Sequence, residues 1–358
     1  MASFKETREL TLLCYAENLL SDDEFLVLWE NNQSSNPDFP WDSYGPFDLE
    51  NIDEAECKAE FRVEKRDLPT LREVLGIPPT FKCPQRTICD GMEGLCMLLK
   101  RLAYPCRYSD MIARFGRPVP ELCMITNRVM DFIYDAHGHR ITQWNDTILN
   151  PRLLEQYATV ITEKGAALDN CFGFVDGTVR PISKLGDMQR IVYNGHKKVH
   201  ALKFQSVAIP NGLIANIFGP VEGRRHDAGM LHDSGLLHNL EAYAYSATGL
   251  PMCLYGDPAY PLRVHLQGPF QNPHLTPLME AYNSSMSSVR VSVEWLFGDI
   301  IEYFKFMDFK KNLKIGMSSI GKMYIVCALL QNALSCLYGN NTATFFDLEP
   351  PILQDYFA

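Results

Sequence analysis

Hydrophobic positions in the first half of the chain recur with the three-to-four-residue spacing of helices. The pattern predicts helical segments over 10–30, 86–105, 109–116 and 120–137. Ser109 suits the N-cap of the third segment and Gly116 its end, because serine accepts hydrogen bonds from free N–H groups and glycine tolerates left-handed backbone. The last two segments, joined by a short turn, form a pair that fits either a helix-turn-helix that binds DNA or plain helical packing.

From residue 171 the pattern becomes typical of strands. The apolar run 171–176 ends at Asp176, and a second apolar run ends at Asp257. Between them, two β-rich segments flank Asn211-Gly212, which predicts a hairpin with a two-residue turn. A helix over 227–244 follows, with Asp227 at its N-cap. The alternation of strands and helices predicts a mixed α/β domain.

Two further apolar segments read as buried helices. The segment 288–304 is apolar on almost every side yet contains Glu294, although an unpaired buried carboxylate is costly. The segment 323–338 has 16 residues and includes Gln331 and Asn332, so it is too short and too polar for a membrane span and is predicted to be a core helix. The stretch between residues 258 and 287 is rich in turn residues and predicted to be mostly loop.

Composition and charge divide the chain. Of its 358 residues 46% are hydrophobic, enough for a substantial core, and its 11 cysteines show no C-x-x-C spacing. The net charge of −10 is concentrated in residues 1–67, which hold 17 acidic and 6 basic side chains; the remainder holds 26 and 27. A neutral body with local basic patches is compatible with DNA binding.

We therefore expect four parts along the chain. They are an acidic N-terminal arm (1–67), a helical region with the helix-turn-helix-like pair (68–168), the mixed α/β domain (169–338) and a peripheral tail (339–358).

Three carboxylates stand out by position. Asp176 and Asp257 follow predicted strands, and Glu294 lies in a predicted buried helix. If they converge, their mutual repulsion raises their pKa values unless a cation neutralises them. Oxygen ligands suit Mg²⁺ or Mn²⁺, and two such ions can stabilise the attacking and leaving oxygens in phosphodiester cleavage.

Each carboxylate also has a simpler interpretation. Asp176-Gly177 and Asp257-Pro258 both suit ordinary turns at strand ends. Glu294 could form an ion pair with Arg290, which lies one helical turn before it. Position alone leaves these alternatives open.

The amino-acid sequences of four segments resemble the DDE endonuclease domain of PIF/Harbinger transposases and their domesticated relatives. The segments are FVDGT (174–178), HKKVHALKFQSVAIPNGLIANIFGPVEGRRHDAGML (196–231), YGDPAYP (255–261) and VRVSVEWLFG (289–298). The resemblance implies an RNase H-like fold, a mixed sheet flanked by helices. It also implies a metal-dependent DNA endonuclease or transposase, in which Asp176, Asp257 and Glu294 hold two Mg²⁺ or Mn²⁺ ions.

Other residues in the matching segments are candidates for supporting roles. His226-Asp227 matches an H-D pair of the family and would support the site, contact DNA or cap a helix. Arg290 belongs to the last motif, next to the site. The candidates for holding DNA phosphates, each of which could equally be a solvated surface charge, are Lys197, Lys198, Lys203, Arg224 and Arg225.

The resemblance also sets expectations about partners. DNA is the expected substrate, a Myb-like protein would supply DNA recognition and nuclear import, and we expect a nuclear homo-oligomer with no membrane contact. The competing hypothesis is a domesticated, catalytically silent scaffold that binds DNA or protein, in which the acidic arm docks a basic partner. An unrelated hydrolase is disfavoured, because the sequence contains no G-x-S-x-G, P-loop or G-x-G-x-x-G motif.

Overall fold

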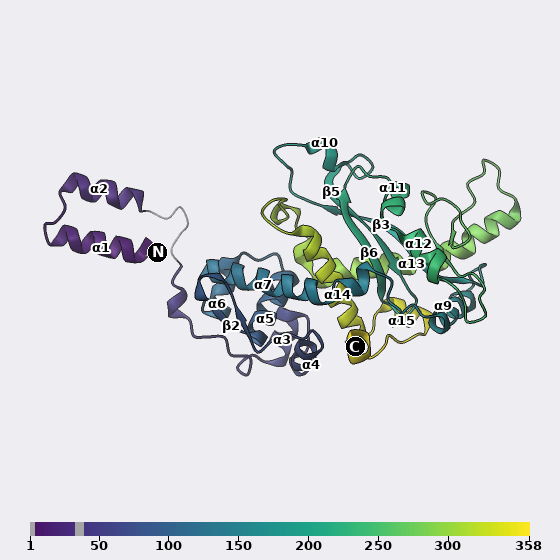
Figure 1. Cartoon of the computed structure of the whole chain (residues 1–358), viewed down its shortest axis with the longest axis horizontal. Helices are drawn as coiled ribbons and strands as arrows, with labels where there is room; N and C mark the ends of the chain where they lie inside the picture. The colour runs from purple at the N-terminus through teal and green to yellow at the C-terminus, as the bar shows by residue number, and fades with distance from the viewer. Residues whose placement is uncertain (1–3, 33–38) are drawn as a thin grey trace.

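The computed structural model describes residues 4–32 and 39–358. Figure 1 shows three parts: two helices that stand apart at the N-terminal end, a helical part in blue, and a sheet with its helices in teal and green. The C-terminal segment, in yellow, returns to lie between the helical part and the sheet.

The elements follow one another in three groups along the chain. The first group comprises α1 (Phe4–Ala16), α2 (Asp22–Asn31), η1 (Trp41–Ser43), α3 (Glu54–Phe61), η2 (Lys65–Asp67), α4 (Leu68–Val74), β1 (Thr80–Lys82), η3 (Pro84–Arg86), β2 (Ile88–Asp90), α5 (Gly91–Ala103), η4 (Tyr108–Met111), α6 (Ile112–Phe115), α7 (Val119–His137), α8 (His139–Thr142) and α9 (Pro151–Glu163). The second comprises β3 (Cys171–Pro181), α10 (Gln189–Val192), β4 (Tyr193–Asn194), β5 (Val199–Ala208), β6 (Ile214–Glu222), α11 (Asp227–Asp233), α12 (Leu236–Tyr243), β7 (Cys253–Tyr255) and β8 (Leu266–Gln267). The third comprises α13 (Pro277–Tyr303), η5 (Lys305–Asp308), η6 (Lys310–Asn312), α14 (Ile320–Tyr338), α15 (Asn341–Phe346) and α16 (Leu353–Phe357).

The larger sheet is mixed, as the sequence predicts. Its order is β4-β5-β3-β7-β8, with β6 pairing to β5. The β5–β6 hairpin is confirmed, since its strands are antiparallel. Its turn is longer than the predicted two residues: the Ile209 N–H donates to the Leu213 carbonyl at 3.1 Å, with residues 210–212 between them, and Gly212 takes a positive φ of 78°. Strands β3 and β7 are parallel, and so are β7 and β8.

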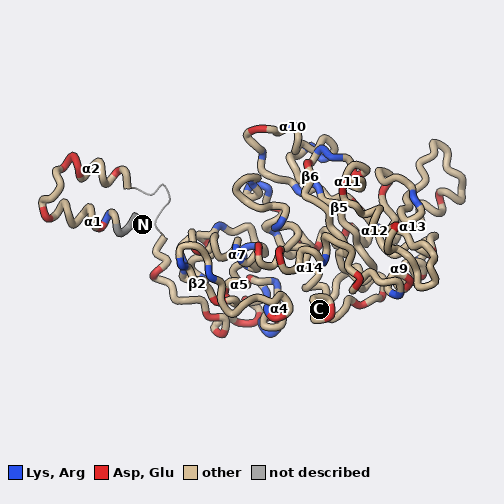
Figure 2. The backbone as a smooth tube through the Cα atoms, viewed as in Figure 1, with Lys and Arg blue, Asp and Glu red and all other residues tan. Residues whose placement is uncertain are grey.

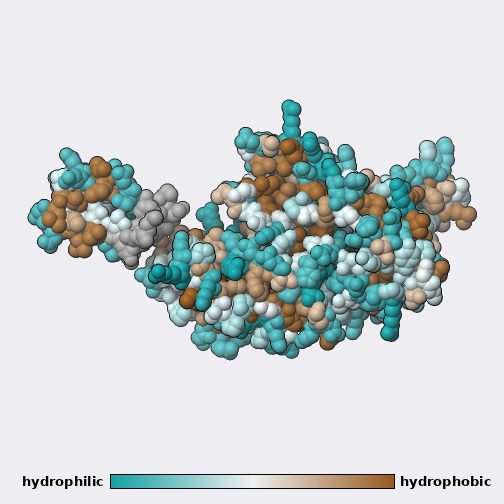
Figure 3. All heavy atoms as spheres, in the orientation of Figure 1, coloured by the Kyte–Doolittle hydropathy of each residue, from teal (hydrophilic) through white to brown (hydrophobic). Residues whose placement is uncertain are grey.

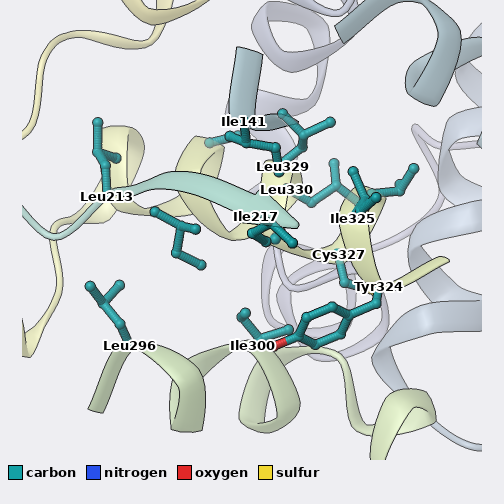
Figure 4. Packing of buried hydrophobic residues seen from close by; sticks show 14 of the residues in the cluster. Ile141, Leu213, Ile217, Leu296, Ile300, Tyr324, Ile325, Cys327, Leu329 and Leu330 are labelled. Atoms are coloured by element: carbon teal, nitrogen blue, oxygen red, sulfur yellow. The ribbon is translucent and has the colours of Figure 1, made fainter. Parts of the chain in front are cut away.

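Helices cover the sheet and form a continuous core with it. Helices α9 and α13 contact β3, and α14 contacts both β6 and α7, so α14 joins the sheet to the helical part. Figure 4 shows Ile300 of α13 beside Tyr324 of α14, with Ile217 of β6 and Cys327 of α14 next to them, and all four are buried. This packing is what fixes α13 against the sheet.

The helical part differs in detail from the prediction. Helix α5 begins at Gly91, and residues 88–90 form strand β2 instead of the first turn of that helix. Gly116 ends α6 in the left-handed conformation, as predicted, but Ser109 is inside a 3₁₀ turn and is not its N-cap. Because α6 has only four residues, the pair α6–α7 has a much shorter first helix than the prediction assumed.

Two predictions about the α/β domain and one about the tail are wrong. The predicted helix over 227–244 is two helices, broken where Gly235 takes a positive φ of 65°. Helix α13 begins at Pro277, within the stretch predicted to be loop, where Thr276 caps it. The tail is not peripheral: Phe346 and Tyr356 are buried, and the Tyr356 hydroxyl accepts a hydrogen bond from buried Asn332 at 2.8 Å.

Helix α14 is the buried helix predicted over 323–338. By length and composition it could cross a membrane, but 83% of its apolar window is buried inside the protein. The side chain of Asn332 makes two hydrogen bonds to the backbone of Ile214, both at 2.9 Å. Its oxygen accepts from the Ile214 N–H, and its amide nitrogen donates to the Ile214 carbonyl. A polar side chain at this place therefore pins α14 to β6.

Candidate metal and nucleic-acid site

Asp176 lies in the middle of β3 and not after its end. The strand continues to Pro181 because residues 174–181 all pair with β5, where Ser206 is the partner of Asp176. The Asp176 carboxylate accepts a hydrogen bond from the N–H of Gly177 at 2.9 Å. The simple turn interpretation of Asp176-Gly177 is therefore wrong.

Asp257 lies two residues beyond the end of the neighbouring strand, β7, at the same level as Asp176. In the parallel pair β3–β7, Phe174 is the register partner of Tyr255, so Asp176 and Asp257 each follow their partner residue by two positions. The Asp257 carboxylate accepts a hydrogen bond from the N–H of Ala259 at 3.0 Å, which is a local turn contact. Two carboxylates thus leave adjacent parallel strands at the same level.

A third carboxylate, Asp227, reaches the same place from α11. Lys203 of β5 donates a hydrogen bond to it at 2.7 Å. A Cβ added to Gly177 would meet the Asp227 carboxylate oxygen at 2.4 Å, so Asp227 lies directly over the glycine that follows Asp176. Asp227 is the first residue of α11; the N-cap is His226, which makes no side-chain cap bond. The predicted capping role of Asp227 is wrong.

The electrostatics of these carboxylates are coupled. Burial raises the pKa of Asp176; Arg290 and the Gly177 N–H oppose the rise, and the charges of Asp257 and Asp227 add to it. Burial also raises the pKa of Asp257, and the charge of Asp227 raises it further. The hydrogen bond from the Ala259 N–H and the charges of Arg290 and Lys203 lower it. The three aspartates are therefore close enough to repel one another.

Arg290 of α13 supplies one of the balancing cations. Its guanidinium contacts the Asp176 carboxylate at 3.0 Å, and both side chains are about one-fifth exposed. Its Nε is buried and has no hydrogen-bond partner among the described residues. The predicted pairing of Arg290 with Glu294 is replaced by this contact with the sheet.

Glu294 is not buried. The buried face of α13 comprises Met286, Val289, Ser292, Val293, Leu296, Phe297 and Ile300. Glu294 lies off that face and is exposed, as is Val291, so the helix is amphipathic and not apolar all round. Because Glu294 is four residues beyond Arg290, it lies on the same side of the helix, roughly 6 Å further along the axis.

Tyr260 is a residue that the sequence pattern did not single out, although it lies within YGDPAYP. It is 4% exposed, and its hydroxyl is buried without a hydrogen-bond partner among the described residues. Burial raises its pKa, and the charges of Asp227, Asp176 and Asp257 raise it further, which places its ring beside the three carboxylates. The ring packs on Gly256, where an added Cβ would come within 2.8 Å of it.

The predicted phosphate-binding residues divide into two groups. Lys203 is buried and donates hydrogen bonds to Asp227 and to the Arg225 carbonyl, so in this structure it supports Asp227 and is not exposed to a DNA phosphate. Arg225 forms an ion pair with Asp233. Lys197, Lys198, Arg224 and Arg225 are all exposed, and Arg225 is the one of the four with an ion pair among the described residues.

The fit of this site to a divalent cation can be judged from its donors. Asp176 and Asp257 supply carboxylate oxygens of the kind that Mg²⁺ and Mn²⁺ prefer, and their mutual repulsion is of the kind that a cation relieves. Among residues 4–32 and 39–358, no three His, Cys, Asp or Glu side chains are grouped closely enough to hold a metal ion. Two of the three predicted ligands thus fit, and the third is not assembled with them.

Part of the chain is similar to a known protein family. Residues 175–332 match the DDE superfamily endonuclease family. The match covers less than half of the chain, and we call the matched segment the DDE domain. It contains Asp176, Asp227, Asp257 and Glu294, and it begins within β3 and ends within α14. Searches of curated proteins and of solved structures found no match.

Proposed function

We propose that the chain is a divalent-metal-dependent DNA endonuclease of the Harbinger transposase type, with an RNase H-like domain. The observation that supports this most strongly is the placement of Asp176 and Asp257 at the same level of two adjacent parallel strands within the DDE domain. Bound there, two Mg²⁺ or Mn²⁺ ions would supply the charge that stabilises attacking and leaving oxygens in phosphodiester cleavage.

Each residue near the site has a role in this proposal. Asp176 and Asp257 would hold the ions. Glu294, which is not assembled with them in this structure, would complete the DDE set only by joining them when metal binds. Arg290 neutralises Asp176 before metal binds, and the contact is close enough that a cation at Asp176 competes with it. Lys203 fixes Asp227 beside the other two aspartates.

DNA would approach the exposed basic side chains near the site. Lys197 and Lys198 lie just before β5, and Arg224 follows β6; all three are exposed. Lysine and arginine contacts to phosphates position a duplex without reading its sequence. Sequence recognition would come from the α6–α7 pair or from a Myb-like partner, which would also bring the protein into the nucleus.

Nicking of supercoiled plasmid tests the proposal. With Mg²⁺ or Mn²⁺ present, the wild type nicks the plasmid, and Asp176→Ala, Asp257→Ala and Glu294→Ala each abolish nicking. Glu302→Ala is the matched control, because Glu302 is an exposed acid on the same helix as Glu294. If the three variants nick as well as the wild type, the assignment of the site is wrong.

A second candidate function is a catalytically silent scaffold that binds DNA. The ion pairs of Asp176 with Arg290 and of Asp227 with Lys203 favour it, because they satisfy these carboxylates without metal. A scaffold predicts that gel-shift binding of DNA is unaffected by Asp176→Ala and that neither protein nicks DNA. Metal-dependent nicking by the wild type would exclude this function.

A further inference from the structure

The N-terminal helices α1 and α2 form a hairpin whose apolar side chains are left uncovered. No residue of α2 is buried. Tyr15 stacks on Phe25 at 4.3 Å between ring centroids, and Trp29 continues the stack. The larger apolar side chains that remain exposed are Leu10, Leu12, Leu13, Leu19, Leu26, Val27 and Leu28, and Figure 3 shows brown surface on this part of the molecule.

This hairpin is also acidic. Residues 7–31 contain six Asp or Glu and one Lys or Arg, and in Figure 2 the backbone is red, for acidic residues, at several places along α2 and in the turn before it. Exposed leucines in such number mark an interaction surface. The acidic surroundings select a partner surface that is both apolar and basic.

A surface of that kind exists elsewhere on the chain, made by residues 184–193 and 309–317. The two segments adjoin, because the N–H of Ser183 donates a hydrogen bond to the carbonyl of Leu313 at 2.9 Å. We call them the basic face. They contain one acid, Asp187, and the basic residues Lys184, Arg190, Lys310, Lys311 and Lys314, all exposed.

The basic face carries exposed apolar side chains as well as charge. They are Met188, Tyr193, Phe309, Ile315 and Met317, and Met188 and Met317 are 74% and 80% exposed. Phosphate contacts alone give no reason for exposed methionines, whereas a protein partner does. The basic face therefore matches the hairpin in both charge and apolar character.

We propose that the acidic hairpin of one copy docks on the basic face of a second copy. In Figure 1 the hairpin stands away from its own body, so its apolar side is free to be covered by another chain. In a two-fold dimer the contact occurs twice, once in each direction, which is a common route to closed dimers. The inference rests on these two surfaces and is independent of nuclease activity.

A charge-swap experiment on the full chain tests this docking. The hairpin variant is Glu9→Lys/Glu17→Lys/Glu30→Lys, and the face variant is Lys310→Glu/Lys311→Glu/Lys314→Glu; all six side chains are exposed. Glu73→Lys/Asp135→Lys/Glu163→Lys, at exposed acids outside both surfaces, is the control. Association is measured by sedimentation velocity at low salt over a range of protein concentrations.

The wild type and the control are expected to dimerise, and each triple variant alone to dimerise at least roughly tenfold more weakly. An equimolar mixture of the two variants should recover the dimer, because both contacts then join opposite charges. Recovery also shows that the variants are folded. A monomeric wild type, variants that dimerise normally, or a mixture that stays monomeric would each overturn the proposal; the first would also be the result if each hairpin covered its own chain.

Discussion

The guanidinium of Arg290 contacts the carboxylate of Asp176 at 3.0 Å and thereby ties α13 to the centre of the sheet. Asp176 sits in β3 between carboxylates that repel it, and Arg290 is the cation that most lowers its pKa. The contact thus has two effects. It holds α13, the helix that carries Glu294, against the sheet, and it stabilises the ionised form of the half-buried Asp176.

Replacing Arg290 should destabilise the protein through Asp176. Arg290→Met leaves the carboxylate without its cation, and we expect the free energy of unfolding at neutral pH to fall by about 1–2 kcal/mol, less than for a fully buried pair because both groups are partly exposed. Adding Asp176→Asn should recover most of the loss. Urea denaturation of the two single variants and the double variant measures the coupling; additive losses would contradict the account.

Lys203 should matter more for stability than an equally short ion pair at the surface. Lys203→Met leaves Asp227 uncompensated, and we expect a loss of about 1–3 kcal/mol. Lys322→Met is the matched control, since Lys322 pairs with Asp131 at the same 2.7 Å but both side chains are about two-fifths exposed. The control should lose under about 1 kcal/mol by the same denaturation assay. Equal losses would show that burial of the first pair has no consequence.

Two glycines should respond oppositely to alanine. Gly177→Ala pushes a methyl group into the Asp227 carboxylate, and we expect a loss of about 1–3 kcal/mol. Gly298→Ala meets open space inside α13, so it should stabilise the protein by about 0.5–1 kcal/mol through helix propensity. Thermal melting of both variants decides the matter: a neutral Gly177→Ala would mean that Asp227 does not lie where the structure has it.

Asp299 should make stability depend on pH. Burial raises the pKa of Asp299 to about 6, and Glu302 adds to the rise. A carboxyl with a raised folded-state pKa contributes stability below the unfolded value, near 4, and loses it as pH rises through about 6. Asp299→Asn should therefore melt at a higher temperature than the wild type at pH 7.5.

The same comparison near pH 4.5 should show a much smaller difference. Asp308→Asn, at an exposed aspartate further along the chain, serves as the control. A melting-temperature difference that is the same at both pH values would rule out titration of Asp299 as its cause.

The β5–β6 hairpin, the strand before Asp257 and the buried helix α14 could all be predicted from the sequence, because each has strong local periodicity or turn residues. The exposure of Glu294 could not. Its neighbours are apolar on every side in the sequence, and only the packing of α13 on the sheet decides which of them is covered. The burial of Tyr356 escaped prediction for the same reason, since the tail has no periodicity and gains its place from Asn332 on another helix.

The candidate site was predictable in part. Asp176 and Asp257 were identified from their positions after apolar runs, and strand register shows why those positions are equivalent. The place of Asp227 depends on a lysine 24 residues away and on a glycine that makes room for it, neither of which is visible in local sequence. Contacts between residues far apart in the sequence cannot be predicted from local sequence patterns.

Metal binding at Asp176 and Asp257 is best measured by calorimetric titration of Mn²⁺. We expect saturable binding heat for the wild type and for Asp187→Asn, an exposed aspartate on the basic face. For Asp176→Asn and for Asp257→Asn we expect the affinity to fall at least roughly tenfold, because each removes one anionic ligand from the pair. A wild type that shows no saturable heat, or two variants that bind Mn²⁺ as tightly as the wild type, would contradict the assignment of these aspartates as the metal site.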